Sequence, residues 1–299
     1  MDEISAHEAA QIIHNTLEAA MGNNSDDWAY DISYFLTRVA RAGQAHAHLR
    51  AMLQQDPYRE QIVNSVRSVV THEGESVYRE PRAVSQIASS QHLLNIYVEE
   101  FWRNMSALAH CPDTWDRMAT IDIVHACGAL HASGAAPAPS DDLIQLQRAA
   151  VIQSAPQFRA QDVARAVQSF AQQGVQLGEA QVAMQEAVAR TAHDMRGYNL
   201  LNCLHGYAVL REELGAAREP LMQRLAVMSP HLKHESVSRC LWACGELKVP
   251  AGEWTTGLLR AVRRSLMSQR GSRRGQACSS CGSKADGPEM SKALESVGG

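Results

Sequence analysis

Apolar and small residues recur along the chain at a fixed spacing. Three segments align without gaps, beginning at Phe158, Met195 and Leu232, so the spacing is 37 residues (195 − 158 = 37 and 232 − 195 = 37). In each segment the first residue is apolar, as are the residues five and nine positions later. The residues 11 and 13 positions later are small in every copy: Ser169 and Ala171, Gly206 and Ala208, Ala243 and Gly245. These intervals predict one helix face, and a period of this length is typical of stacked helical repeats.

Each segment continues, after a break at Gly or Pro, into a second apolar-periodic stretch, with Met184 and Val188, Leu221 and Leu225, or Leu258 and Val262. One unit is therefore predicted to be an antiparallel helix pair, which must stack on its neighbours to bury its apolar faces. Two weaker copies precede these, led by Tyr78 and Trp115. The step from Trp115 to Phe158 is six residues longer than 37, and the loop 132–139 accommodates the surplus.

The predicted fold is all-α, an α-solenoid of stacked antiparallel helix pairs with a period of about 37 residues. We expect an N-terminal helical cap or divergent repeat over 1–77, five repeats over 78–270, and a disordered Gly/Ser tail over 271–299. Composition agrees: 45% of the 299 residues are hydrophobic and 20% are charged, enough apolar content for an extended core. No apolar run approaches the length of a membrane span, so no membrane partner is expected.

Charge is distributed unevenly. Residues 1–157 carry 10 Lys and Arg against 19 Asp and Glu, whereas residues 158–270 carry 14 against 10. A polyanion would engage the C-terminal half first, although ordinary solvated helix faces explain so small an excess equally well. The seven cysteines are an odd number, which favours a reducing compartment.

Catalytic and metal-binding motifs are weak. Cys278 and Cys281 have the Cys-x-x-Cys spacing, but no second pair follows at zinc-ribbon spacing, and the setting is a Gly/Ser tail. Incidental tail cysteines are the favoured interpretation, with a metal or redox role left open. The chain has no His-Glu-x-x-His, phosphate-loop or nucleophile-elbow motif. We therefore predict no catalytic residues, no metal and no cofactor.

The polar positions that vary from unit to unit form what we call the variable stripe, a pair of residues three apart on the first helix of each unit. Its members are Ser85 and Ala88, Asp122 and His125, Arg165 and Gln168, Asn202 and His205, and Arg239 and Trp242. Residues three apart share a helical face. Asn, Gln, Arg and His can hydrogen-bond base edges, and His205 or Trp242 can stack on a base. Free drift of solvent-facing residues would produce the same variability.

The repeats beginning at Phe158 and Leu232, with Asp162-Val-Ala-Arg-Ala-Val and Ser236-Val-Ser-Arg-Cys-Leu-Trp-Ala, resemble the heptatricopeptide and octotricopeptide repeats of FAST-kinase-like organellar proteins. The resemblance covers about 78–269, and the spacing is nearest the heptatricopeptide form. It implies a non-enzymatic α-solenoid that binds single-stranded mRNA or rRNA in a mitochondrion or chloroplast. Its roles would be transcript stabilisation, processing, translation or rRNA holding.

Under this hypothesis Arg165, Arg196 and Arg239 contact phosphate, while Gln168, Asn202, His205 and Trp242 contact bases. The alternative is a protein-interaction scaffold, a structural subunit of an organellar ribosome or respiratory assembly, whose acidic N-terminal half faces a basic partner. Acidic Asp2, Glu3 and Glu8 stand where a transit peptide would carry arginine, so no such peptide is expected in this chain.

Overall fold

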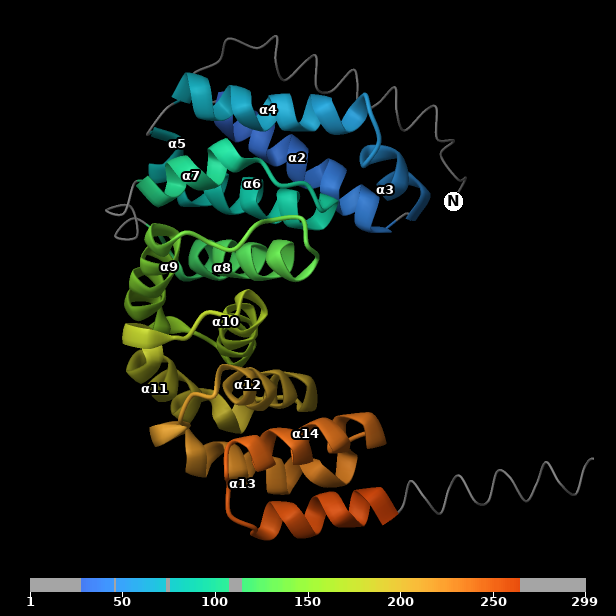
Figure 1. The fold of residues 1–299 in the computed structure, drawn as a ribbon, viewed down its shortest axis with the longest axis vertical. Coiled ribbons are helices and arrows are strands. Elements are labelled where there is room, and N and C mark those ends of the chain that lie inside the picture. The colour runs from blue at the N-terminus through green and yellow to red at the C-terminus, as the bar shows by residue number, and fades with distance from the viewer. Residues whose placement is uncertain (1–27, 46, 74–75, 108–114, 264–299) are drawn as a thin grey trace, which may run out of the picture.

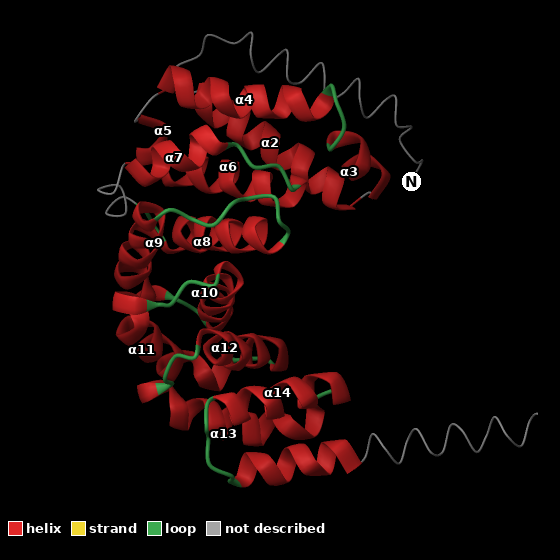
Figure 2. Cartoon of the chain, viewed as in Figure 1, coloured by secondary structure: helices red, strands yellow, loops and turns green. Residues whose placement is uncertain are grey.

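A computed structural model of the chain describes residues 28–45, 47–73, 76–107 and 115–263 (Figure 1). Every regular element of these residues is helical, as Figure 2 shows, which confirms the all-α prediction. The expected disordered tail over 271–299, including Cys278 and Cys281, lies outside the described residues.

Two rows of helices make up the fold, and the chain alternates between them from α6 onward. The inner row consists of α2 (Trp28–Ala45), α6 (Pro81–Leu94), α8 (Arg117–Ala132), α10 (Ala160–Gln173), α12 (Gly197–Leu210) and α14 (His234–Glu246), each packed on the next. The outer row consists of α4 (Tyr58–Glu73), α7 (Glu99–Ala107), α9 (Asp141–Ser154), α11 (Gln181–Thr191) and α13 (Arg218–Met228), also in successive contact. The rows follow a curved stack, with α10 and α12 on the inner side and α9 and α11 on the outer side (Figure 1).

Short helices connect the rows. The helices α3 (Ala47–Leu53) and α5 (Ser76–Arg79) flank α4, and single 3₁₀ turns precede the later long helices: η2 (Ala155–Gln157), η3 (Gly178–Ala180), η4 (Ala192–Asp194), η5 (Gly215–Ala217) and η6 (Ser229–His231). A last helix begins at residue 253 and continues to residue 263, the last described residue. The loop between α8 and α9 contains most of the stretch that the sequence predicts as the six-residue surplus.

Local chemistry explains where the helices begin. The Asp116 carboxylate accepts a hydrogen bond from the Ala119 N–H at 2.7 Å and caps α8. In α10, the Asp162 carboxylate accepts from the backbone N–H of Arg159 at 2.9 Å. Asp162 also pairs with Arg117 of α8, so one carboxylate both starts a helix and ties two inner helices together.

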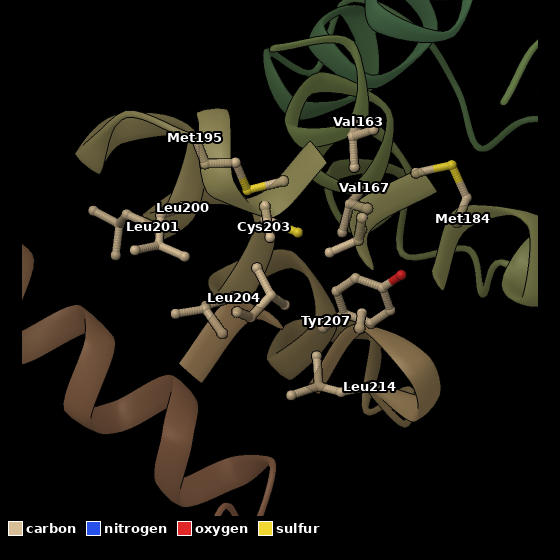
Figure 3. Close-up of a cluster of buried hydrophobic side chains, with 14 of the residues drawn as sticks. Val163, Val167, Met184, Met195, Leu200, Leu201, Cys203, Leu204, Tyr207 and Leu214 are labelled. Atoms are coloured by element: carbon tan, nitrogen blue, oxygen red, sulfur yellow. The ribbon is translucent and has the colours of Figure 1, made fainter. Parts of the chain in front are cut away.

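The core extends through the whole stack as two clusters that meet at α8. Ile121 and Val124 belong to the C-terminal cluster, while Ile123 and Ala126 belong to the N-terminal one, and all four are buried. A helix in the middle of a row buries residues against both neighbours, so its apolar residues occupy more than one face. Figure 3 shows the packing around α12, where Cys203 and Tyr207 lie toward Val167 of α10 and Leu204 lies on the opposite side of the helix.

The apolar residues that begin the aligned sequence segments lie just before inner helices, and we call them anchors. Phe158 and Met195 are 1% and 0% exposed. The indole N–H of Trp115 donates to the backbone oxygen of Tyr78 at 3.3 Å, so two successive anchors touch directly. Arginines from the outer row complete the arrangement: Arg190 donates to the Phe158 oxygen at 3.0 Å and Arg224 to the Met195 oxygen at 2.8 Å.

Small residues permit the close approach of inner helices. A Cβ built on Gly128 would lie 2.7 Å from the Cα of Ser169, and one on Gly206 would lie 2.6 Å from Cγ1 of Val167. Real Cβ atoms do not approach other atoms so closely, so a larger residue at either position would force its neighbour to move. The small positions of the sequence pattern therefore face the neighbouring inner helix in the middle of the stack.

Candidate nucleic-acid interface

Within the part of the chain that the structure describes, one face of the inner row is not covered by another helix. Each of α8, α10 and α12 has an inner neighbour on two sides and an outer helix behind it, so its remaining face lies on the concave side of the stack (Figure 1). The variable stripe falls on this face. Arg165 and Gln168 come from α10 and are partly exposed, whereas Arg239 and Trp242 come from α14 and are exposed.

Asn202 departs from the expected exposure. Its side chain on α12 is only 4% exposed, so it is not available to a ligand in the way that the sequence predicts. Ser85, at the equivalent place on α6, is buried as well, at 8%. The longer side chains at this position, Arg165 and Arg239, reach solvent. The position therefore lies at the margin of the contact between helices, and only a long side chain extends past it.

His205 and Trp242 form a ring pair across two inner helices. Their ring centroids lie 5.1 Å apart with an interplanar angle of 43°. Burial, followed by the positive charge of Arg239, lowers the pKa of His205 below its ordinary value. The imidazole is therefore neutral at physiological pH. Trp242 is 45% exposed, so one part of its ring rests on His205 while the rest remains open to a ligand.

Arg196 occupies a different place from the other predicted contacts. It is the N-cap residue of α12 and is exposed at the end of that helix, whereas the variable stripe runs along the helix face. Arg159 and Lys233, the N-cap residues of α10 and α14, are exposed in the same way. The structure thus brings His205, Arg239 and Trp242 together and places Arg196 at the edge of the same row.

We call the concave side of the inner row the inner face. Its N-terminal part differs chemically from its C-terminal part. The rings of His92 on α6 and His125 on α8 meet edge to face, with centroids 5.1 Å apart. Burial, then the charges of His92 and Arg165, lower the pKa of His125 to about 4. Burial raises the pKa of Asp122 to about 6, against the opposing effect of Arg165. The N-terminal part of the inner face therefore carries a carboxyl group and two neutral imidazoles, whereas the C-terminal part carries Arg239 and Trp242.

Several arginines in and just before the basic C-terminal half are structural. Arg190 and Arg224 bind the backbone oxygens of the anchors, and Arg148 donates to the Gln176 oxygen at 2.8 Å. These hydrogen bonds place the guanidinium groups against the fold, although their positive charge remains. The excess of Lys and Arg over Asp and Glu in residues 158–270 is therefore larger than the positive charge that faces the concave side. No local motif marks these arginines, because their partners are backbone groups 28 to 35 residues away.

Sequence reasoning missed two features. Tyr198 is 69% exposed on α12, one turn before Asn202, and adds an aromatic ring to the inner face. The only signal for it is its position four residues ahead of the variable stripe. The second feature is a cavity of about 250 Å³ between α7, α8 and the loop before α9, lined by Tyr97, Trp102 and Leu130 among others. No residue of the variable stripe lines this cavity.

The described residues offer little for metal or thiol chemistry. They contain no group of three or more His, Cys, Asp or Glu side chains arranged to hold a metal ion. Cys203 and Cys240 are buried, and burial raises the pKa of their thiols to about 12 and about 11. Both therefore remain protonated thiols at neutral pH. Among the described helices, none is both long and apolar enough to cross a bilayer.

The chain matches no protein-family model and no curated protein sequence.

Proposed function

We propose that the chain is an α-solenoid with a unit of 37 residues, and that the concave face of α10, α12 and α14 binds single-stranded RNA. The spacing of the elements supports the repeat. The helices α10, α12 and α14 begin at residues 160, 197 and 234, and the turns η3 and η5 begin at 178 and 215. Each interval is 37 residues, so equivalent side chains recur on neighbouring inner helices.

One observation carries the RNA proposal: an exposed indole, Trp242, is backed by a neutral imidazole, His205, one turn from the exposed guanidinium of Arg239. A base can stack on an aromatic face while a nearby cation holds its phosphate, which is the usual arrangement for single strands. Tyr198 and Arg196 supply a second ring and a second cation on the adjacent helix α12. By the resemblance of the repeats, the RNA would be an organellar mRNA or rRNA, and no catalytic step is proposed.

The test is equilibrium binding of a fluorescently labelled oligouridylate, followed by anisotropy at several salt concentrations. Binding through three arginines should weaken with salt along a log–log slope of about −2, because each phosphate contact on a single strand contributes about −0.7. Arg239→Glu should abolish most of the binding. Arg218→Glu, at an exposed site on the outer helix α13, is the matched control and should retain it. Salt-independent binding, or equal losses in both variants, would contradict the proposal.

A protein-interaction scaffold is the second candidate, and the outer row favours it. Val182 on α11 and Val227 on α13 are 63% and 61% exposed, and Ile152 on α9 is 40% exposed. A protein-binding surface requires such residues to form one contiguous apolar patch, and these three lie on successive outer helices. A partner isolated from the native cell should be lost on changing Val182 and Val227 to Ser if this candidate is right. Retention of the partner by that double variant would exclude the outer row as its binding surface.

A further inference from the structure

We infer that the cavity between α7, α8 and the loop before α9 is a binding site for a small, neutral, bicyclic aromatic molecule. The cavity has a volume of about 250 Å³. An apolar cavity of about 150 Å³ holds a benzene molecule, so this cavity has room for a larger ring system such as indole. The inference goes beyond the proposed RNA-binding function and does not depend on it, because the cavity is lined by none of the variable-stripe residues.

The cavity lies where the chain departs from its repeated pattern. In the two later units, the loop that joins the inner helix to the outer helix places a leucine in the core, Leu177 before α11 and Leu214 before α13. The loop before α9 has no such leucine, since the residues that it contributes to the cavity, 136–140, are Ala, Pro, Ala, Pro and Ser. The equivalent loops thus bury an apolar side chain, and an apolar ligand suits the space that remains here.

The buried wall of the cavity is aromatic and aliphatic. Trp102, Leu130 and Leu143 line it and are almost fully buried. The indole N–H of Trp102 already donates to Oε1 of Gln91 at 3.0 Å, so Trp102 contributes ring carbons to the cavity. The ring of Tyr97 lies parallel to that of Trp102, with centroids 6.5 Å apart. A flat ring gains most from such a wall, through burial of apolar surface and contact with aromatic rings.

The polar groups of the buried wall are satisfied within the protein. The carboxamide groups of Gln173 and Gln147 exchange two hydrogen bonds of 3.0 Å, and the Ser106 hydroxyl donates to the Arg103 oxygen at 2.8 Å. Burial raises the pKa of the Cys127 thiol, so this group carries no charge at neutral pH. A charged ligand would lose its hydration here without gaining a partner, which favours a neutral one.

The opposite side of the cavity is open to solvent. Glu99 and Arg103 of α7 line it and are exposed, and their side chains form an ion pair of 3.5 Å. The opposite charges offset each other, so this rim does not select a charged ligand. The loop contributes further exposed residues to the rim, namely Pro137, Ala138 and Ser140. A ligand can therefore enter beside the loop and place its ring against the buried wall.

The experiment is a titration of the full chain with indole, followed through the NMR resonances of the leucine methyl groups. Leu130 and Leu143 line the cavity, so their methyl resonances should shift and reach saturation. The resonances of Leu177 and Leu214, which lie in the C-terminal core cluster, should not move. Methyl resonances of Leu130 and Leu143 that stay unchanged up to the solubility limit of indole would overturn the inference.

A pair of matched variants locates the site. Ala136 lines the cavity and packs against the core, so Ala136→Leu should fill the space with an aliphatic group and abolish the saturable shifts. Ala132→Leu makes the same change at an exposed residue in the last turn of α8, outside the cavity, and should bind indole as the wild type does.

Urea unfolding checks that both variants keep the fold. Retention of indole binding by folded Ala136→Leu, or equal loss in the two variants, contradicts a site in this cavity. If Ala136→Leu does not fold, the wild-type titration decides the question alone. Indole should leave the affinity for oligouridylate unchanged, so a failure of either proposal is distinguishable from a failure of the other.

Discussion

The helices α8 and α14 carry the same repeat pattern but differ in their surroundings. In α8, both flanks are packed, and the side chains of the variable stripe, Asp122 and His125, are half-buried. In α14, Arg239 and Trp242 are exposed. The glycines differ in the same way: a Cβ on Gly128 would collide with Ser169, whereas a Cβ on Gly245 would meet nothing. The same sequence position is thus structural in one helix and open in the other.

The largest expected effect is on stability. Gly128→Ala should lower the free energy of unfolding by about 1–3 kcal/mol, because the added methyl group forces α8 and α10 apart. Gly245→Ala should raise it by up to about 1 kcal/mol, since alanine favours a helix where space is free. Urea denaturation of the two variants measures both changes. Equal destabilisation would show that the end of the row is packed like its middle.

The second largest expected effect is on RNA binding, which should depend on α14 more than on α8. Trp242→Ala should weaken oligouridylate binding of the order of ten-fold, because one stacked base contributes about 1–3 kcal/mol. His125→Ala, at the equivalent position of α8, should change the affinity much less. Anisotropy titrations at low salt give both values. A larger loss from His125→Ala would place the binding surface on the N-terminal part of the inner face.

The pH dependence of stability tests His125, the half-buried histidine of α8. The pKa of His125 is lowered in the folded chain to about 4 from 6.5, so the unfolded chain takes up the proton first as the pH falls. The contribution of neutral His125 to the free energy of unfolding is therefore fully present above pH 6.5 and is lost as the pH falls towards 4. Asp122, whose pKa is raised from 3.8 to about 6, acts in the opposite direction, because the folded chain holds that proton more tightly.

Replacing His125 with Gln should consequently remove an acid-induced loss of stability. Between pH 6.5 and 4 the wild-type chain should lose more stability than His125→Gln, as measured by urea unfolding at several pH values. Parallel curves for the two proteins would mean that the His125 imidazole is accessible to protons in the folded state.

The smallest expected effect concerns salt. Arg239→Gln should reduce the salt slope of RNA binding by nearly one phosphate contact, about 0.7 in the log–log plot. Arg165→Gln should reduce it by less, because the Arg165 side chain is half-buried whereas Arg239 is exposed. Titrations over a series of KCl concentrations resolve the difference. Equal slopes for the two variants would remove the distinction between the arginines.

The all-α class and many buried positions follow from the spacing of apolar residues in the sequence. Phe158, Met195 and the aliphatic positions after them are buried as the pattern predicts, and Gly128 and Gly206 lie at contacts between helices. Periodicity identifies a buried column, since the same packing requirement recurs in each unit. This periodicity is sufficient to predict the all-α class without any knowledge of tertiary contacts.

The interface was less predictable, since exposure at the margin of a helix contact depends on side-chain length. Asn202 is buried where Arg239 is exposed, although both occupy the same place in the repeat. Hydrogen bonds from Arg190 and Arg224 to backbone oxygens leave no local signal either. Tyr198 is exposed on α12 one turn before Asn202. The variable stripe does not include Tyr198, because it consists only of pairs of residues three apart.

The most direct test of the account is photo-crosslinking of the full chain to a labelled oligouridylate, followed by mass spectrometry of the crosslinked peptides. Crosslinks are expected at Tyr198, His205 and Trp242 on the inner face of α12 and α14. Crosslinks confined to the outer helices α11 and α13, or none above the level of a free-peptide control, would contradict it.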